Sequence, residues 1–112
     1  MEATLQTIIA GIVGRSYPIV APEGTATPYA VWQQVGGSDQ SFMDNTRAKK
    51  HGRVQIAIWG PSPAALAPLR ETLELTLRAR TDITCTPADA HVMTHEPATG
   101  LYGLRQDWNI WS

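Results

Sequence analysis

The residues best suited to chemistry lie near the C-terminal end of the chain: Cys85, Asp89, His91, His95 and Glu96. Zinc accepts these side-chain types as ligands, and a cysteine beside a histidine can act as nucleophile and base. On a strand, however, His91 and His95 would lie about 13 Å apart at ~3.3 Å per residue, too far to share one ion. We therefore interpret Cys85 as a small buried apolar residue and the histidines as solvated or hydrogen-bonded.

Other catalytic patterns are absent from the sequence. It contains no G-x-x-x-x-G-K-[ST] phosphate loop, no dinucleotide-type glycine fingerprint and no serine in a G-x-S-x-G elbow. We predict that the protein is not an enzyme, and that it has no catalytic residues, no metal ligands and no cofactor.

Both lysines of the protein fall in one short basic segment, residues 47–53. One interpretation is a solvated loop that leads into an edge strand, where lysine discourages aggregation. The other is a loop that faces DNA phosphates or an acidic partner, without a pattern that would read bases. The residues assigned to this DNA or acidic-partner contact are Arg47, Lys49, Lys50 and Arg53.

Four tryptophans make up half of the aromatic residues. Alternation along a strand places Trp59 on an outward, polar face, and an exposed tryptophan is a typical interface anchor. The alternative is that a second layer covers that face. The residues assigned to a subunit or partner interface are Trp59, Trp32, Asp39 and Asp44.

The helical period appears in two segments. In the first, one apolar stripe contains Leu5, Ile8, Ile9, Ile12 and Val13, and Gly14 is placed to end the helix. In the second, Ser62 is the expected N-cap and Pro63 the first helical residue. Its apolar stripe contains Leu66, Leu69, Leu73 and Leu77. Pro68 predicts a kink or a late start near Ala67.

The strand pattern appears in several segments. Residues 29–35 read as a strand that Gly36 and Gly37 interrupt. Residues 53–59 alternate strictly, with Val54, Ile56 and Ile58 on one face. Residues 82–86, 90–95 and 101–111 are further candidates, the last one long. Residues 15–28 are expected to form an extended surface connection, and the long segment 36–52 to be functional or mobile.

Length and composition indicate one globular domain, residues 1–112. The order of the expected elements (helix, strands, long helix, strands) indicates the α+β class, with a mostly antiparallel sheet packed against two helices. The hydrophobic fraction is 43% and the formal net charge is −1, which argues against disorder and against a dedicated nucleic-acid binder. A charged fraction of only 17% suggests a partner-covered surface. One cysteine excludes an internal disulfide, and no apolar stretch approaches the ~20 residues of a membrane span. We expect a soluble cytoplasmic domain with no membrane contact.

Five segments together resemble the small tail-completion, or tail-terminator, proteins of long-tailed phages and prophages. The opening of that family resembles residues 17–24 (YPIVAPEG) followed by 28–32 (PYAVW). The family continues with a long polar loop, a strand similar to 53–59 (RVQIAIW) and a helix start similar to 62–66 (SPAAL). It closes on an aromatic-rich strand similar to residues 102–111.

The resemblance implies a non-enzymatic structural subunit of the virion tail, present in the host cytoplasm before assembly. Such subunits self-associate into a ring, commonly a hexamer, that caps the tail tube protein and joins it to the head–tail connector protein. Genomic DNA passes through the lumen without being read. The alternatives are a bacterial adaptor domain that binds a peptide or protein at the sheet edge, and a small metal-binding protein.

Overall fold

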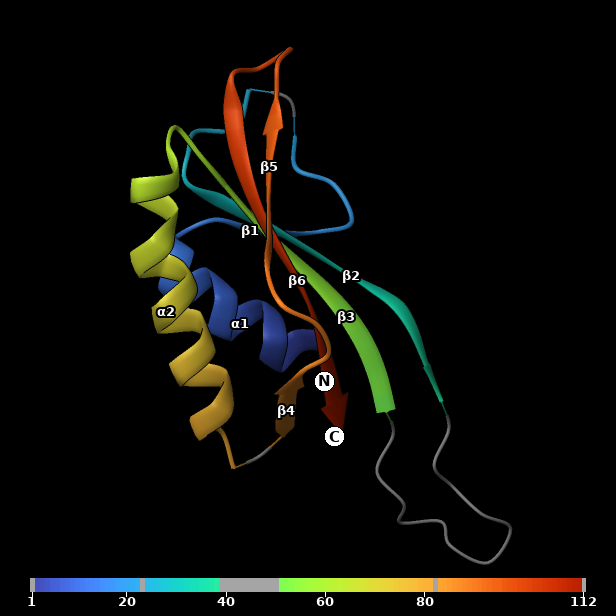
Figure 1. Cartoon of the computed structure of the whole chain (residues 1–112). Helices are drawn as coiled ribbons and strands as arrows, with labels where there is room; N and C mark the ends of the chain where they lie inside the picture. The colour runs from blue at the N-terminus through green and yellow to red at the C-terminus, as the bar shows by residue number, and fades with distance from the viewer. Residues whose placement is uncertain (1, 23, 39–50, 82, 112) are drawn as a thin grey trace, which may run out of the picture.

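The computed structural model describes residues 2–22, 24–38, 51–81 and 83–111. Within these residues the chain forms two helices and six strands (Figure 1). In chain order they are α1 (Glu2–Val13), β1 (Ser16–Pro18), β2 (Tyr29–Ser38), β3 (His51–Gly60), α2 (Pro63–Ala79), β4 (Thr84–Pro87), β5 (Val92–Glu96) and β6 (Leu101–Trp111).

All six strands belong to one sheet in the order β1-β2-β3-β6-β4, and β5 also pairs with β6. β1 runs parallel to β2, whereas every other pair is antiparallel. β4 pairs with the C-terminal half of β6 and β5 with its N-terminal half, so both short strands lie along one edge. The predicted α+β class with a mostly antiparallel sheet is confirmed.

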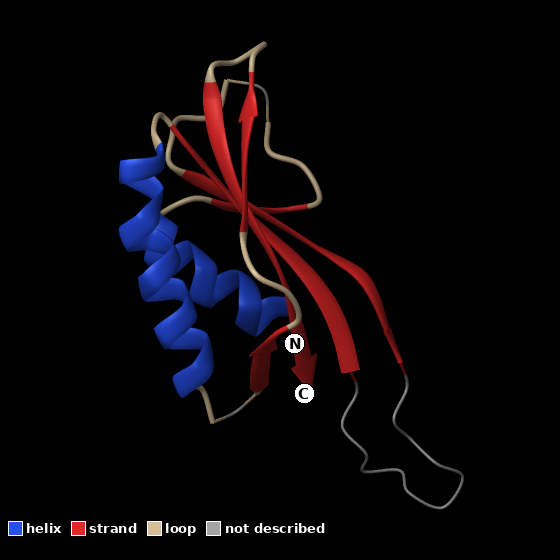
Figure 2. Ribbon diagram, viewed as in Figure 1, coloured by secondary structure: helices blue, strands red, loops and turns tan. Residues whose placement is uncertain are grey.

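Both helices pack on the same face of the sheet (Figure 2). Every second residue of β3, from Gly52 to Gly60, is buried, as the predicted alternation requires. Across the same face, β6 contributes Leu104, Trp108 and Ile110 to the core, and α2 contributes Leu66, Leu73 and Leu77. None of the described helices is long and apolar enough to cross a membrane.

The helix ends follow the predicted capping chemistry. Gly14 adopts a φ of +96°, a conformation that glycine takes at little cost, and its N–H donates to the Ala10 carbonyl at 2.9 Å. The Ser62 hydroxyl accepts from the Ala65 N–H at 3.2 Å. The expected late start of α2 near Ala67 is wrong because this cap begins the helix at Pro63, and Pro68 lies inside it.

Three strand expectations need correction. β2 does not end at Gly36 and Gly37 but continues to Ser38. A β-bulge between Gln34 and Gly36 shifts the register with β3 and lets the strand pairing continue. The expected surface connection contains β1, whose three residues pair with residues 30–32 of β2. β4 and β5 begin and end later than expected, at residues 84–87 and 92–96. Residues 39–50 of the long segment lie outside the described residues.

Candidate interaction surface

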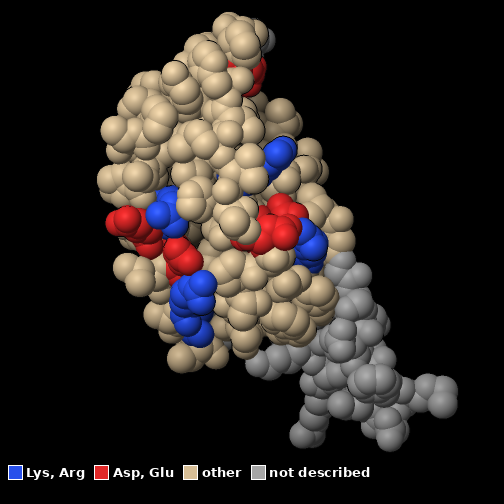
Figure 3. Space-filling model, in the orientation of Figure 1, with Lys and Arg blue, Asp and Glu red and all other residues tan. Residues whose placement is uncertain are grey.

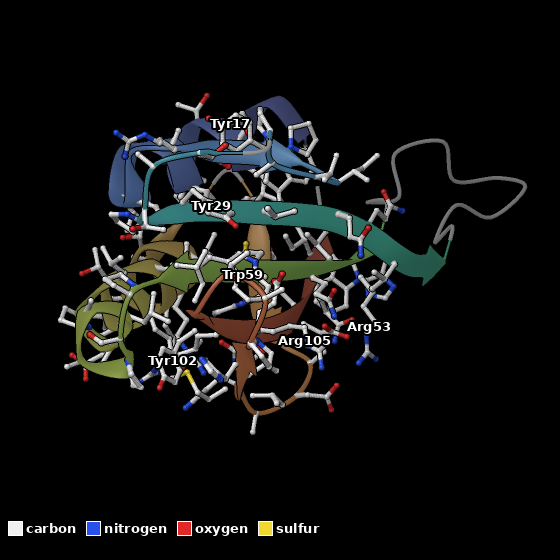
Figure 4. The ribbon with its side chains drawn as sticks, turned by 90° about the horizontal axis from the view of Figure 1, so that it is seen from above. Tyr17, Tyr29, Arg53, Trp59, Tyr102 and Arg105 are labelled. Atoms are coloured by element: carbon white, nitrogen blue, oxygen red, sulfur yellow. The ribbon has the colours of Figure 1, made fainter. Side chains whose placement is uncertain are left out.

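The face of the sheet opposite the helices is open. The odd-numbered residues of β3, from His51 to Trp59, point to this face and are half-buried. Figure 4 labels Tyr17, Tyr29, Trp59 and Arg105, which come from four adjacent strands, β1, β2, β3 and β6. The register pairs place these residues in neighbouring rows on the same face.

A hollow of about 320 Å³ lies on this open face. Its apolar lining comes from β2, β3 and the segment after β1: Ile19, Val20, Val31, Ala57 and Trp59. Arg105 and Glu96 also line it, and neither forms an ion pair with another described residue. An apolar area beside one uncompensated cation and one anion suits a protein partner better than a phosphate backbone.

The Trp59 ring packs against β6 at Gly103. Trp59 and Gly103 are register partners, and a methyl group added to Gly103 would lie 2.8 Å from Trp59 Cζ3 and 2.9 Å from Cη2. The ring therefore occupies the space that a side chain at position 103 would take. Trp59 is on the outward face that the sequence predicted, but it is a fixed, half-buried platform and not a free side chain.

Tyr29 lies beside Trp59 as its register partner on β2. Burial raises the pKa of the Tyr29 phenol above its ordinary value of 10.0, and the negative charge of Glu96 raises it further. Both effects disfavour the phenolate. The phenol is consequently a neutral hydrogen-bonding group at the hollow.

Arg53 is tied to two carboxylates on the open face. Its Nε donates to Asp107 Oδ2 at 2.9 Å and its Nη2 to Asp89 Oδ2 at 2.5 Å. The hydrogen bond with Asp107 raises the pKa of the Arg53 guanidinium, against a smaller opposing effect of desolvation. Figure 3 shows basic side chains beside acidic ones on this part of the molecule. Little of the Arg53 charge is therefore left uncompensated for the predicted phosphate contact.

Trp32, one of the expected interface residues, is buried within the single chain. Its side chain is only 7% exposed, on the helix-covered face, and its Nε1–H donates to Gln6 Oε1 at 2.6 Å. Trp32 is therefore a core residue of the single chain. The sequence could not show this, because it does not tell which face of the strand the first helix covers. The other expected interface and basic residues lie outside the described residues: Asp39, Asp44, Arg47, Lys49 and Lys50.

The cysteine and histidine cluster does not assemble into a metal site in the described part of the chain. Within these residues, no group of three or more His, Cys, Asp or Glu side chains could hold an ion. Cys85 is 6% exposed and belongs to the core. His95 packs against Tyr102 with ring centroids 4.5 Å apart.

Sequence reasoning missed several residues of the hollow, among them Tyr29, Glu96 and Arg105. The period-2 pattern could have placed Arg105 opposite Leu104, on the outward face. Nothing local indicates that Glu96 reaches the same hollow, because this requires the pairing of β5 with β6.

A small α+β domain with one open sheet face, partly apolar and partly charged, is typical of a protein that assembles with other proteins. The family model of tail completion protein gp17 matches residues 2–111. The chain therefore belongs to this phage tail completion family, whose members are structural components of the virion tail, and the predicted resemblance is confirmed. No curated protein sequence matches the chain.

Proposed function

We propose that this tail completion protein is a tail terminator. It assembles into a ring, most simply a hexamer, that caps the tail tube and joins it to the head–tail connector while DNA passes through the lumen. Its role is structural and not enzymatic, and the subunit is in the host cytoplasm before assembly. Membership of the tail completion family supports the tail role.

The observation that carries the proposal is the open sheet face with its immobilised Trp59. A closed ring is a head-to-tail arrangement, so each subunit needs two different complementary surfaces. The face or edge of the sheet around Trp59 supplies one contact surface, since its aromatic platform is already fixed against Gly103 and loses little freedom on binding.

The connection between β2 and β3 supplies the second contact in this proposal. It joins two strands whose outward faces belong to the open face, and its residues Asp39 and Asp44 reach a neighbouring subunit or the tail tube. Its basic residues, Arg47, Lys49 and Lys50, face the DNA lumen or an acidic partner. Counter-charges of this kind hold DNA without reading its sequence.

Complementation of a phage that lacks this gene tests the proposal. The wild-type protein should restore tails of defined length joined to heads, whereas Trp59→Ala should fold and yet fail. An aromatic anchor buried in an interface commonly contributes about 2 kcal/mol or more to binding. Leu75→Ala is the matched control, because Leu75 is 70% exposed on α2, away from the sheet. Normal tails from a folded Trp59→Ala protein would contradict this assignment.

A further inference from the structure

β5, the short orange strand of Figure 1, leaves part of its backbone pointing away from the sheet. The Asp107 carbonyl of β6 points to the β5 side, since it accepts from the Ala88 N–H at 2.9 Å. Alternate residues of a strand direct their backbone groups the same way. Residues 105, 103 and 101 therefore also face β5, where their register partners are residues 92, 94 and 96. The N–H and C=O groups of the residues between, Met93 and His95, point outward.

This outer side of β5 is uncovered in the described part of the chain. No described residue hydrogen-bonds to the outward backbone groups of Met93 or His95. Every residue of β5 except Thr94 is exposed, and Val92 and Met93 are large apolar residues. The strand contains no proline and no lysine, which commonly protect an edge. β5 is thus an edge that can accept another strand.

β1, at the other edge of the sheet, cannot supply that strand from a second copy. The Ser16 carbonyl accepts from Gln6 Nε2 at 2.6 Å, and the Pro18 carbonyl accepts from the Val20 N–H at 2.8 Å. Pro18 also has no N–H to donate. Because the outward groups of β1 are used within the chain or missing, a second copy offers its own β5 instead.

β5 is complementary to itself about Thr94. When two β5 strands run antiparallel about a two-fold axis at Thr94, Met93 of each copy lies opposite His95 of the other. Their outward groups then form two hydrogen-bonded pairs, which exchange four hydrogen bonds. The two Thr94 residues face each other between these pairs, and threonine pairs across strands are favourable. A shift by one residue would set outward groups against inward ones.

The same register brings together the two unpaired charges of the hollow. Val92 and Arg105 are register partners, and Glu96 of the second copy would lie on the other side of Val92. The backbones of Arg105 and that Glu96 are then two strand spacings apart, about 10 Å, which their two side chains can span. Within the described part of its own chain neither residue forms an ion pair. The two-fold axis creates two such pairs, and this complementarity favours a second copy as the occupant.

We propose that the free subunit forms a two-fold dimer in which the β5 strands of two copies pair antiparallel about Thr94. The inference goes beyond the proposed ring, because a two-fold contact joins like surfaces whereas a ring contact joins unlike ones. The pairing covers Val92 and Met93 and joins the two charges beside the hollow. The interface is small, so the dimer dissociates on dilution and describes the subunit before tail assembly.

Proline at position 93 removes an outward N–H without removing a hydrogen bond within the chain. Edge strands accept proline where the N–H faces solvent, so Met93→Pro should retain the circular dichroism spectrum of the wild type. Two hydrogen bonds are lost per dimer, so the dissociation constant in sedimentation equilibrium should rise about tenfold or more. Met93→Thr retains the N–H and should dimerise nearly as well as the wild type. Equal dissociation constants for the two variants would overturn the pairing.

Charge reversal tests the register without a change in the backbone. Glu96→Arg alone opposes two cations at each contact, and Arg105→Glu alone opposes two anions, so each variant should be largely monomeric. In an equal mixture every contact again joins an acid and a base, so the mixture should form heterodimers. A contact within one chain cannot produce this result. A mixture that stays monomeric would overturn the proposed register.

Cysteine cross-linking locates the axis. Cys85 is the chain's one cysteine, so Cys85→Ala provides the background. Facing residues of a non-hydrogen-bonded pair have Cα atoms about 4.5 Å apart, within disulfide range, and Thr94→Cys should oxidise to a covalent dimer. Val92→Cys, on the same strand and face, should give none, because its two copies are about 13 Å apart along the strands. Equal cross-linking of the two variants, or none in either, would overturn the axis.

The dimer and the ring fail in different ways. A wild-type subunit that sediments as a monomer at all concentrations, yet forms rings on purified tail tubes, would overturn the dimer and leave the ring standing. A subunit that dimerises through β5 and never forms rings on tail tubes would overturn the ring and leave the dimer.

Discussion

Gly103→Ala tests whether Trp59 is a fixed platform. The added methyl group would lie 2.8 Å from Trp59 Cζ3 and 3.0 Å from Thr94 Oγ1, closer than side-chain atoms normally approach. Overpacking of this kind costs about 1–3 kcal/mol. Alanine in place of a strand glycine also regains about 0.5–1 kcal/mol through the unfolded chain. We expect Gly103→Ala to lower the free energy of unfolding by about 1 kcal/mol.

The same substitution should behave differently when the tryptophan is absent. In a Trp59→Ala background the two closest ring atoms are gone, and Gly103→Ala should be neutral or stabilising by up to about 1 kcal/mol. The coupling between the two sites should therefore be about 1–2 kcal/mol, in the range of contacting residues. Gly36→Ala is the matched control, because the nearest side-chain atom, Arg53 Cβ, would lie 3.8 Å away.

Urea unfolding followed by circular dichroism measures this double-mutant cycle at a protein concentration where the chain is monomeric. Circular dichroism is preferred because the removal of Trp59 changes the fluorescence signal. Equal effects of Gly103→Ala in both backgrounds, with a coupling below about 0.5 kcal/mol, would refute the contact. Trp59 would then be a loose surface side chain without a pre-organised position.

Further predictions concern a cap, a titration and the basic residues. Ser62→Ala should lower the free energy of unfolding by about 1 kcal/mol, since it removes the acceptor of the Ala65 N–H. Ser62→Asp should retain most of the stability that the cap contributes, measured in the same urea assay. Because the pKa of the Tyr29 phenol is raised in the folded state, its contribution to the free energy of unfolding is fully present below pH ~10. That contribution is lost as the pH rises through the folded-state pKa. Stability should thus fall with alkaline pH more steeply in the wild type than in Tyr29→Phe, and Glu96→Gln should lower the phenol pKa in an absorbance titration. Changing Arg47, Lys49 and Lys50 together to glutamine should alter the free energy of unfolding by less than ~0.5 kcal/mol, while DNA retention or assembly suffers. A large drop in melting temperature would show instead that these side chains are structural.

Much of the fold could be predicted from local patterns. The apolar stripe before Gly14, the cap at Ser62 and the alternation around Ile56 each depend on residues within a few positions, so each element appears where the sequence predicts it. The same periodicity predicted that Trp59 and the helix-covered core lie on opposite faces of β3. These features follow from backbone geometry, in which side chains repeat every 2 or 3.6 residues.

The interaction surface depended on contacts between distant segments. The packing of Trp59 on Gly103, the ion pairs of Arg53 with Asp89 and Asp107, and the burial of Trp32 each need the sheet order and register. β1 is only three residues long and has too little periodicity to predict a strand; its pairing with β2 forms the edge that displays Ile19. Register sets which side chains meet, and it emerges only when non-local strands pair. The sequence alone therefore determined the class and family of this protein, whereas tertiary pairing decided which residues its open face and edges present.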